Sequence, residues 1–258
     1  MGTALVTGAS SGIGEAFARA LAGRGDDLVL VARSADRLEA LAAELRARHG
    51  VRAEVIAADL ADPAAPDASA AELAARGLAV DTLINNAGFG THGEFAAQDA
   101  KRERDEVIVN AYAPLALTHA LLPGMLARKH GEIVNVASTA AFQPVPYMAT
   151  YGATKAFLLS FSEALAEEVR AHGVRVVALC PGQTDTAFFT EIGEARVGRA
   201  RRPEQVVASA LRALRRGRAV VVDGFANYLL ANANRFVPRA VTTRVAAMMQ
   251  RPKSFSAR

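Results

Sequence analysis

The sequence predicts a single α/β domain in which a doubly wound, mostly parallel sheet of seven strands carries helices on both faces. Short β-rich segments alternate with helix-length segments rich in Ala, Leu, Arg and Glu along the chain. The β-rich segments are nearly continuous apolar runs, which is typical of strands buried on both faces of a parallel sheet. A chain of 258 residues, 51% of them hydrophobic, suffices for one large domain and is short for two.

The alternation divides the chain into elements in a regular order. We expect strands at residues 3–7, 28–33, 52–58, 82–86, 132–137, 174–179 and 219–222. We expect helices between them at residues 12–22, 35–48, 68–76, 102–127, 151–172 and 203–216. Ser34 is a candidate cap for the second helix, and glycines follow several helix ends as C-terminal stops. This order predicts a right-handed sandwich over residues 1–224, followed by a helical tail over residues 225–258.

Composition restricts the setting in which the protein works. The single cysteine, Cys180, excludes an intramolecular disulfide, so we expect the reducing cytoplasm. We find no secretory signal, no uninterrupted apolar run that spans a bilayer, and no metal-ligand spacing among the five histidines. The net charge is +4, but the chain after Asp223 holds six basic residues and no acidic one. The rest of the chain is nearly balanced and gives no electrostatic case for a nucleic-acid partner.

A glycine-rich turn joins the first expected strand to the first expected helix, with a G-x-x-x-G-x-G spacing. Glycines there allow a tight turn and close approach of a cofactor phosphate, which the helix N-terminus attracts. Such a turn is often merely a turn, but its place in the first strand–helix unit favours dinucleotide binding. The residues expected to contact the dinucleotide are Gly8, Ser10, Ser11, Gly12, Ile13 and Gly14.

Four further motifs follow in order along the chain. They are Asn85-Asn86-Ala87-Gly88 after the fourth expected strand, Ser138 after the fifth, Tyr151-Gly152-Ala153-Thr154-Lys155, and Pro181-Gly182 with Thr184 and Thr186 after the sixth. Together with the glycine turn, this set resembles the classical short-chain dehydrogenase/reductases over roughly residues 3–224. The resemblance implies a Rossmann fold and hydride transfer between a nicotinamide cofactor and a carbonyl or alcohol.

Tyr151 and Lys155 are four residues apart at the start of an expected helix, so their side chains lie on one face. A free tyrosine titrates near ~10, and a cation held nearby lowers that pKa. Alone, such a pair is common on helix surfaces, and a serine often simply closes a strand. The resemblance implies that Ser138 orients the substrate while Tyr151 gives or takes the proton. It also implies that Lys155 lowers the pKa of Tyr151 and binds the nicotinamide ribose, and that Asn110 holds a relay water.

The end of the second expected strand bears on the choice of cofactor. An acidic residue there typically holds the ribose 2′-hydroxyl of NAD, whereas a basic residue accommodates the 2′-phosphate of NADP. Arg33 and Ser34 stand at this place and no acid occurs before Asp36, which favours NADP(H) and leaves NAD(H) open. The further cofactor contacts implied by the resemblance are Asp59, Leu60, Asn86, Ala87, Gly88, Tyr151, Lys155, Pro181, Gly182, Thr184 and Thr186.

Apolar residues beside Tyr151 favour a ketone, an aldehyde or a 3-oxoacyl group on an apolar body as the substrate. The same residues could instead belong to the core or to a subunit contact. They are Phe142, Val145, Tyr147, Met148, Phe188, Phe189, Ile192 and Val197.

The tail beyond residue 224 has apolar residues at near-helical spacing with arginines between them, and Pro238 is expected to divide it into two helices. We favour an arm that packs on its own domain or on a partner subunit; contact with an anionic membrane surface is the alternative. The resemblance implies a homodimer or homotetramer.

Two other functions fit parts of the sequence. A redox sensor that binds NADP(H) without turnover needs the glycine turn but not the Ser–Tyr–Lys set. An extended-type epimerase or lyase requires a longer chain with a larger substrate domain. The complete set therefore favours an enzyme that acts on a small carbonyl or alcohol substrate.

Overall fold

Seven parallel strands form one sheet in the computed structural model, which describes residues 2–192 and 200–252. The strands are β1 (Thr3–Thr7), β2 (Asp27–Ala32), β3 (Ala53–Ala57), β4 (Thr82–Asn85), β5 (Gly131–Val136), β6 (Val174–Cys180) and β7 (Val220–Val222). Their order is β3-β2-β1-β4-β5-β6-β7, which confirms the doubly wound fold. Because the order reverses between β1 and β4, the carboxyl ends of these strands border the crevice in which such sheets bind ligands.

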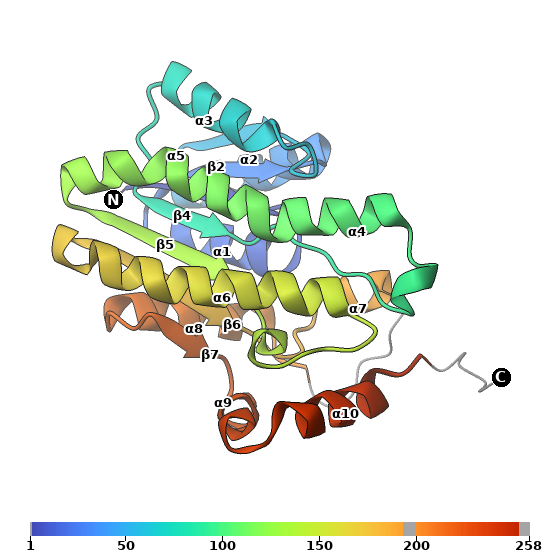
Figure 1. The fold of residues 1–258 in the computed structure, drawn as a ribbon. Coiled ribbons are helices and arrows are strands. Elements are labelled where there is room, and N and C mark those ends of the chain that lie inside the picture. Colours follow the sequence, from blue (N-terminus) through green and yellow to red (C-terminus); the bar gives the residue numbers. More distant parts are fainter. Residues whose placement is uncertain (1, 193–199, 253–258) are drawn as a thin grey trace.

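Helices cover both faces of this sheet (Figure 1). They are α1 (Gly12–Ala22), α2 (Ala35–His49), α3 (Ala65–Ala75), α4 (Ala100–Val107), α5 (Ala113–Arg128), α6 (Ala149–Val169), α7 (Phe188–Glu191), α8 (Pro203–Arg215), α9 (Phe225–Ala233) and α10 (Arg239–Gln250). In β1, Ala4 and Val6 are buried with α1, α2 and α8, whereas Leu5 is buried with α3, α5 and α6. Water is therefore excluded from both faces, which explains the continuous apolar runs.

Several helices begin or end where the sequence pattern did not predict. α3 begins at Ala65 because Pro66 occupies its first turn, where the missing N–H costs nothing. The single helix expected at residues 102–127 is α4 and α5 joined by a π-helical turn, Ile108–Tyr112. Ser34 is the N-cap residue of α2, but its side chain makes no cap hydrogen bond. The predicted place of the cap is therefore confirmed, but the side chain of Ser34, an exposed residue, does not contribute the hydrogen bond that serine usually makes there.

The continuous helical run Ala100–Arg128 is long and apolar enough, by length and composition, to cross a membrane, although we expected no such run. In the structure this run lies along the sheet. Two of its own residues, Leu117 and Met125, are fully buried in the core. A core helix passes the same test, so the run by itself indicates nothing about a membrane.

The tail forms α9 and α10, which lie below the body of the domain in Figure 1. Pro238 is the N-cap residue of α10, as its missing N–H predicts. The tail meets the domain through small residues such as Ala231 and Ala246, which are 4% and 5% exposed. Its large apolar side chains point outward and are 37–88% exposed: Phe225, Tyr228, Leu229, Phe236, Val237, Val241, Val245, Met248 and Met249.

Candidate active site

The glycine turn lies directly after β1, at the point where the strand order reverses. Gly8 and Gly12 have φ angles of +64° and +58°, in the left-handed region that favours glycine. A Cβ at Gly14 would lie 2.2 Å from the carbonyl oxygen of Gly8, so the helix can approach the strand only without a side chain. Ser11 is the N-cap residue of α1 and its hydroxyl makes no cap hydrogen bond. The turn therefore presents bare backbone and a hydroxyl at a helix N-terminus, which suits a phosphate.

Two other expected members of the turn have different surroundings. Ser10 is half-buried next to Ser11, where its hydroxyl can also meet a phosphate. Ile13 packs against the hydrophobic core beneath the turn. The Ile13 side chain therefore anchors the turn, and only its backbone is placed to contact a cofactor.

The end of β4 is fastened to the end of β1. Asn86 donates from Nδ2 to the carbonyl oxygens of Thr7 and Gly8, at 3.0 and 3.3 Å. The backbone N–H groups of Asn86 and Ala87 both donate to the Thr7 hydroxyl, at 2.9 and 3.0 Å. Thr7 thus fixes the two walls of the crevice, a role that the sequence analysis missed.

Ser138 and Tyr151 meet at the carboxyl end of β5. Ser138 caps a 3-10 turn, Thr139–Phe142, and Tyr151 lies in the first turn of α6. Burial raises the pKa of Tyr151 to about 12, while the neighbouring Ser138 hydroxyl favours the phenolate and the charge of Glu106 disfavours it. At neutral pH the phenol therefore carries its proton and can donate it.

Lys155 lies one turn further along α6 and is 4% exposed. Its Nζ donates to the carbonyl oxygen of Val136 at 2.8 Å and lies 5.7 Å from the centroid of the Tyr151 ring. Gly88 comes so close that a Cβ there would lie 3.3 Å from Nζ. Burial lowers the pKa of Lys155 to about 8, although Glu106 favours the charged form. The lowering of the Tyr151 pKa by Lys155 stays a prediction, because burial has the largest effect on the pKa of this phenol.

Asn110 is fully buried in the π-helical turn between α4 and α5. Its side chain pairs with the backbone of Phe89, accepting from N at 3.1 Å and donating to O at 2.8 Å. Nδ2 also donates to the Thr154 hydroxyl at 3.2 Å. Asn110 therefore ties the segment after β4 to the helix that carries Tyr151, and π-helical turns are frequent at functional sites.

The ends of β2 and β3 extend the same edge of the sheet. Arg33 and Ser34 directly follow β2 and are exposed. Within the described part of the chain, neither side chain has a hydrogen-bond or ion-pair partner, so both are available to a 2′-phosphate. Asp59 follows β3 and accepts from the backbone of Ala61 at 3.1 Å, and Leu60 beside it is buried.

The loop after β6 closes the other side of the crevice. The carbonyl oxygen of Pro181 accepts from the N–H of Thr139 at 2.9 Å, and the Thr184 hydroxyl donates to the carbonyl oxygen of Gly182 at 3.2 Å. A Cβ at Gly12 would lie 3.0 Å from Cγ2 of Thr186, so Thr186 borders the glycine turn. The expected cofactor residues thus follow the carboxyl ends of neighbouring strands along one edge of the sheet, from Arg33 to Thr186.

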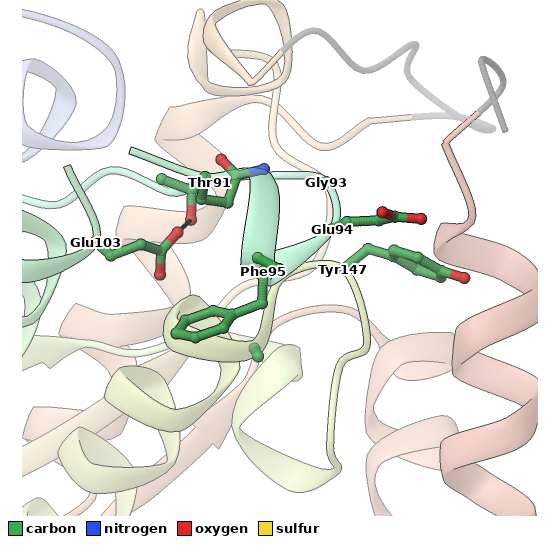
Figure 2. A pocket seen from close by; sticks show the side chains of 9 residues that line it. Thr91, Gly93, Glu94, Phe95, Glu103 and Tyr147 are labelled. Carbon is green, nitrogen blue, oxygen red and sulfur yellow. Dashed lines mark hydrogen bonds between the residues drawn. The ribbon is translucent and has the colours of Figure 1, made fainter. Parts of the chain in front are cut away.

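A pocket of about 330 Å³ lies beside the first turn of α6 and is lined by Thr91, Gly93, Glu94, Phe95, Ala96, Gln98, Glu103, Tyr147 and Ala149. Figure 2 shows Thr91 and Glu103 pointing toward each other at one end, and Glu94 and Tyr147 at the other. Tyr147 has a φ of +65°, and its carbonyl oxygen accepts from the N–H of Gly93 at 2.8 Å. This backbone strain in a non-glycine residue is typical of functional sites.

The other expected substrate residues divide between the site and the core. The Phe188 ring lies 5.3 Å from the Tyr151 ring, centroid to centroid. Val145 and Met148 are buried, and Phe142 packs against the core cluster around Leu159. Val197 and the side chain of Phe189 lie outside the described residues.

Two carboxylates beside the site, Glu103 and Glu106, were not predicted from the sequence. Glu106 lies four residues before Asn110, which is one helical turn, and Glu103 lies three before Glu106. That spacing could have indicated that they share a face with Asn110. The glycine turn after β1 and the pair of Tyr151 and buried Lys155 are typical of the class of dinucleotide-dependent oxidoreductases.

The chain belongs to the short chain dehydrogenase family, whose sequence profile matches residues 2–197. It is 40% identical to a very-long-chain 3-oxoacyl-CoA reductase of Phaeosphaeria nodorum over 178 residues, which are 67% of this chain and 52% of that protein. The chain thus spans about half the length of this curated relative. It is also 40% identical to a serine 3-dehydrogenase of Agrobacterium fabrum, with 72% of this chain and 74% of that protein covered.

Among solved structures, a short-chain dehydrogenase from Sphingobium yanoikuyae in complex with NADPH is similar over 100% of this chain and 98% of that one. The TM-score is 0.84 and the sequence identity is 35%. The similarity therefore includes the tail as well as the domain.

Proposed function

We propose that the protein transfers a hydride between NADP(H) and the carbonyl or alcohol group of an apolar substrate. The Ser138 side chain next to the Tyr151 phenol, beside the buried ammonium of Lys155, carries this proposal. The nicotinamide, when bound, supplies or accepts the hydride. In the reductive direction Ser138 holds the substrate oxygen and Tyr151 gives it a proton, while Lys155 stabilises the phenolate that remains.

NADP(H) is the proposed cofactor because the residues around the crevice fit its phosphates. The turn has no room for a Cβ at Gly8 or Gly14, and Ser11 offers an uncommitted hydroxyl at the start of α1. Arg33 can bind a 2′-phosphate as a fork, with Ser34 beside it. The NADPH bound by the relative from Sphingobium yanoikuyae supports this assignment.

An apolar ketone or 3-oxoacyl group is the proposed substrate. Phe188 packs on the Tyr151 ring, and a Cβ at Gly90 would lie 3.3 Å from Cε of Met148, so the reacting group meets apolar walls. The relative from Phaeosphaeria nodorum is named for a long-chain 3-oxoacyl thioester, which agrees with such walls. The relative from Agrobacterium fabrum is named for serine, a small polar substrate that these walls do not favour.

The competing function is a redox sensor that binds NADP(H) without turnover. The test is a panel of apolar ketones, 3-oxoacyl thioesters and serine, each assayed with NADPH or NADP⁺ and with NADH or NAD⁺. We expect turnover of an apolar carbonyl with NADPH, loss of that turnover in Tyr151→Phe, and unchanged NADPH binding in this variant. Tyr228→Phe, which removes the hydroxyl of a tyrosine that is 51% exposed on the tail, is the matched control and keeps its turnover. Full activity in Tyr151→Phe would sink the mechanism, and NADPH binding without turnover of any compound would favour the sensor.

We further propose that the protein is a homodimer or homotetramer and that a partner subunit covers the outward face of the tail. The exposed side chains of Val241, Val245 and Met248 lie on one face of α10, which supports a covered surface. An anionic membrane is the other candidate, because arginines flank these residues. Co-sedimentation with anionic vesicles decides between them. Equal pelleting of the full chain and a chain ending at residue 224 would remove the membrane.

A further inference from the structure

Glu106 is a buried acid that the proposed reaction does not use. It lies on α4, one turn before Asn110, and is 0% exposed. Its Oε1 has no hydrogen-bond partner among the described residues. A buried carboxylate oxygen without a partner is costly, whereas the neutral acid is tolerated there. The surroundings of Glu106 therefore favour a proton on this carboxyl group.

The Thr91 hydroxyl bridges Glu106 to a second acid. Its Oγ1 lies 2.8 Å from Oε2 of Glu106 and 2.6 Å from Oε1 of Glu103. A hydroxyl has one proton and can donate to only one of two carboxylates. The second short contact therefore requires a proton on one of the two carboxyl groups. Glu103, Thr91 and Glu106 hold one proton beyond that of the hydroxyl itself.

The two acids differ in their surroundings, which decides where that proton resides. Glu103 also accepts a hydrogen bond from the Thr150 hydroxyl and lines the pocket, so its charge is satisfied (Figure 2). Burial raises the pKa of Glu106 to about 7, and the charge of Glu103 adds to this effect; Thr91 and Lys155 oppose it. The proton resides on Glu106 until the solution reaches neutral pH.

The charge on Glu106 acts on the Tyr151–Lys155 pair. When ionised, Glu106 raises the pKa of both Tyr151 and Lys155. The charged or titratable groups that interact with Glu106 are Glu103 on its own helix and the Tyr151–Lys155 pair on α6. A change of one charge at Glu106 therefore changes the ionisation of the groups that move the proton.

Resting on the proposed function, we propose that Glu106 is a positioning residue: it shares one proton with Glu103 through Thr91, and its charge sets the ionisation of Tyr151 and Lys155. When the proton leaves, the Thr91 hydroxyl proton moves to Glu103 while the Glu106 proton moves to Thr91. The hydroxyl is regenerated, Glu106 becomes the anion, and Glu103 releases the proton at the pocket. The reverse movement reloads Glu106 from the pocket.

The first test uses infrared spectroscopy of the full chain without substrate or cofactor. Wild type should show the carbonyl band of a protonated carboxylic acid that disappears with a midpoint of about pH 7. Glu106→Gln should lack this band, and Glu103→Gln should move its midpoint to lower pH, because the neighbouring negative charge is removed. Glu94→Gln, which changes an exposed pocket residue outside the cluster, is the matched control and should keep the band unchanged. An unaltered band in Glu106→Gln would overturn the assignment.

The second test is the pH profile of kcat/KM. The kcat/KM of wild type should show a limb near pH 7. Glu106→Gln should lose this limb and Glu94→Gln should keep it. KM for NADPH should be unchanged in both variants. If Glu106→Gln does not fold, Thr91→Val tests the coupling instead, because it removes the bridging hydroxyl and leaves both acids in place. In the infrared titration of this variant, Glu103 and Glu106 should ionise independently of each other. A limb that persists in the folded variants refutes the coupling. The infrared result does not depend on turnover, so a titrating band without activity refutes the proposed function alone.

Discussion

Lys155 donates from Nζ to the carbonyl oxygen of Val136, 2.8 Å away, so the cation of the site is tied to the end of the interior strand β5. Val136 stands two residues before Ser138, whose hydroxyl favours the phenolate of Tyr151. One strand end therefore positions both the cation and the serine relative to the acid. A change at Lys155 should disturb the chemistry more than the fold, because its partner is a backbone group that remains in place.

Lys155→Met should lower kcat by about 10²–10⁴-fold, the usual range for losing a group that assists proton transfer. Lys155→Arg should restore little of the lost kcat. Gly88 lies close to the ammonium group, and the planar guanidinium cannot occupy this confined place. Steady-state kinetics at saturating NADPH measures the effect, and circular dichroism checks the fold. The chain has three other lysines, and Lys129 is an exposed one at a helix end. Lys129→Met should therefore leave kcat unchanged. Wild-type kcat in Lys155→Met would exclude the role of the cation.

Arg33→Ala should raise KM for NADPH by about 10-fold or more while KM for NADH changes little, since a charge-assisted contact of this kind contributes about 1.5–3 kcal/mol. Only NADPH carries the 2′-phosphate that this guanidinium can bind. Arg48→Ala, which removes an exposed arginine at the far end of α2, is the control. Equal increases of both KM values would instead indicate a general loss of the cofactor site.

The layers of this fold could be predicted because each depends on a local pattern. Strands buried on both faces require apolar residues, and the tight turn after Thr7 requires glycines. Both requirements are visible in the sequence. The π-helical turn around Asn110 could not be predicted, because it depends on the hydrogen bonds of that side chain with Phe89, 21 residues away. Ser34 shows the reverse case: the residue type suits a cap, yet its hydroxyl is left free.

The site was predictable where one motif carries the chemistry and not where distant segments meet. Ser138, Tyr151 and Lys155 stand in recognisable motifs, and the structure brings them together. Thr91 and Glu103 stand in no motif, because their role arises only when the loop after β4 folds against α4. The outward apolar face of the tail was also hidden, since near-helical spacing does not tell which face of a helix meets the domain.

The stability of the protein should fall between about pH 4.5 and pH 7 because of Glu106, whose pKa rises from 4.5 to about 7 on folding. The folded state holds this proton more tightly than the unfolded chain, so the contribution is complete below pH 4.5 and lost as pH rises through 7. The loss should be no more than about 3.5 kcal/mol, at about 1.4 kcal/mol per pKa unit. Urea unfolding of wild type and Glu106→Gln across this range measures the difference. Parallel curves for the two proteins would contradict the shift.

Arg201→Ala should destabilise the domain by about 3 kcal/mol, because it leaves a buried carboxylate without its charge partner. Arg201 Nε lies 2.5 Å from Oδ2 of Asp223, whose side chain is 1% exposed. Ser209 donates a further hydrogen bond to Asp223 at 2.7 Å, which cannot compensate the charge alone. Thermal unfolding should show a fall in Tm of several degrees, against no change for the exposed control Arg215→Ala. A Tm equal to that of wild type would show that Asp223 is not held by this pair.

Val245→Asp combined with Met248→Asp should reduce the oligomeric state without unfolding the domain. The two side chains are 45% and 72% exposed on the outer face of α10, so a charge there costs an isolated subunit little. In an assembly that covers this face, two buried carboxylates would be costly and the subunits would separate. Light scattering coupled to size exclusion measures the mass, and thermal unfolding checks the fold. Arg239→Ala, at an exposed polar position of the same helix, should keep the wild-type mass. A mass that is unchanged in the double variant would exclude the tail from the subunit contact and leave the vesicle assay to identify its partner.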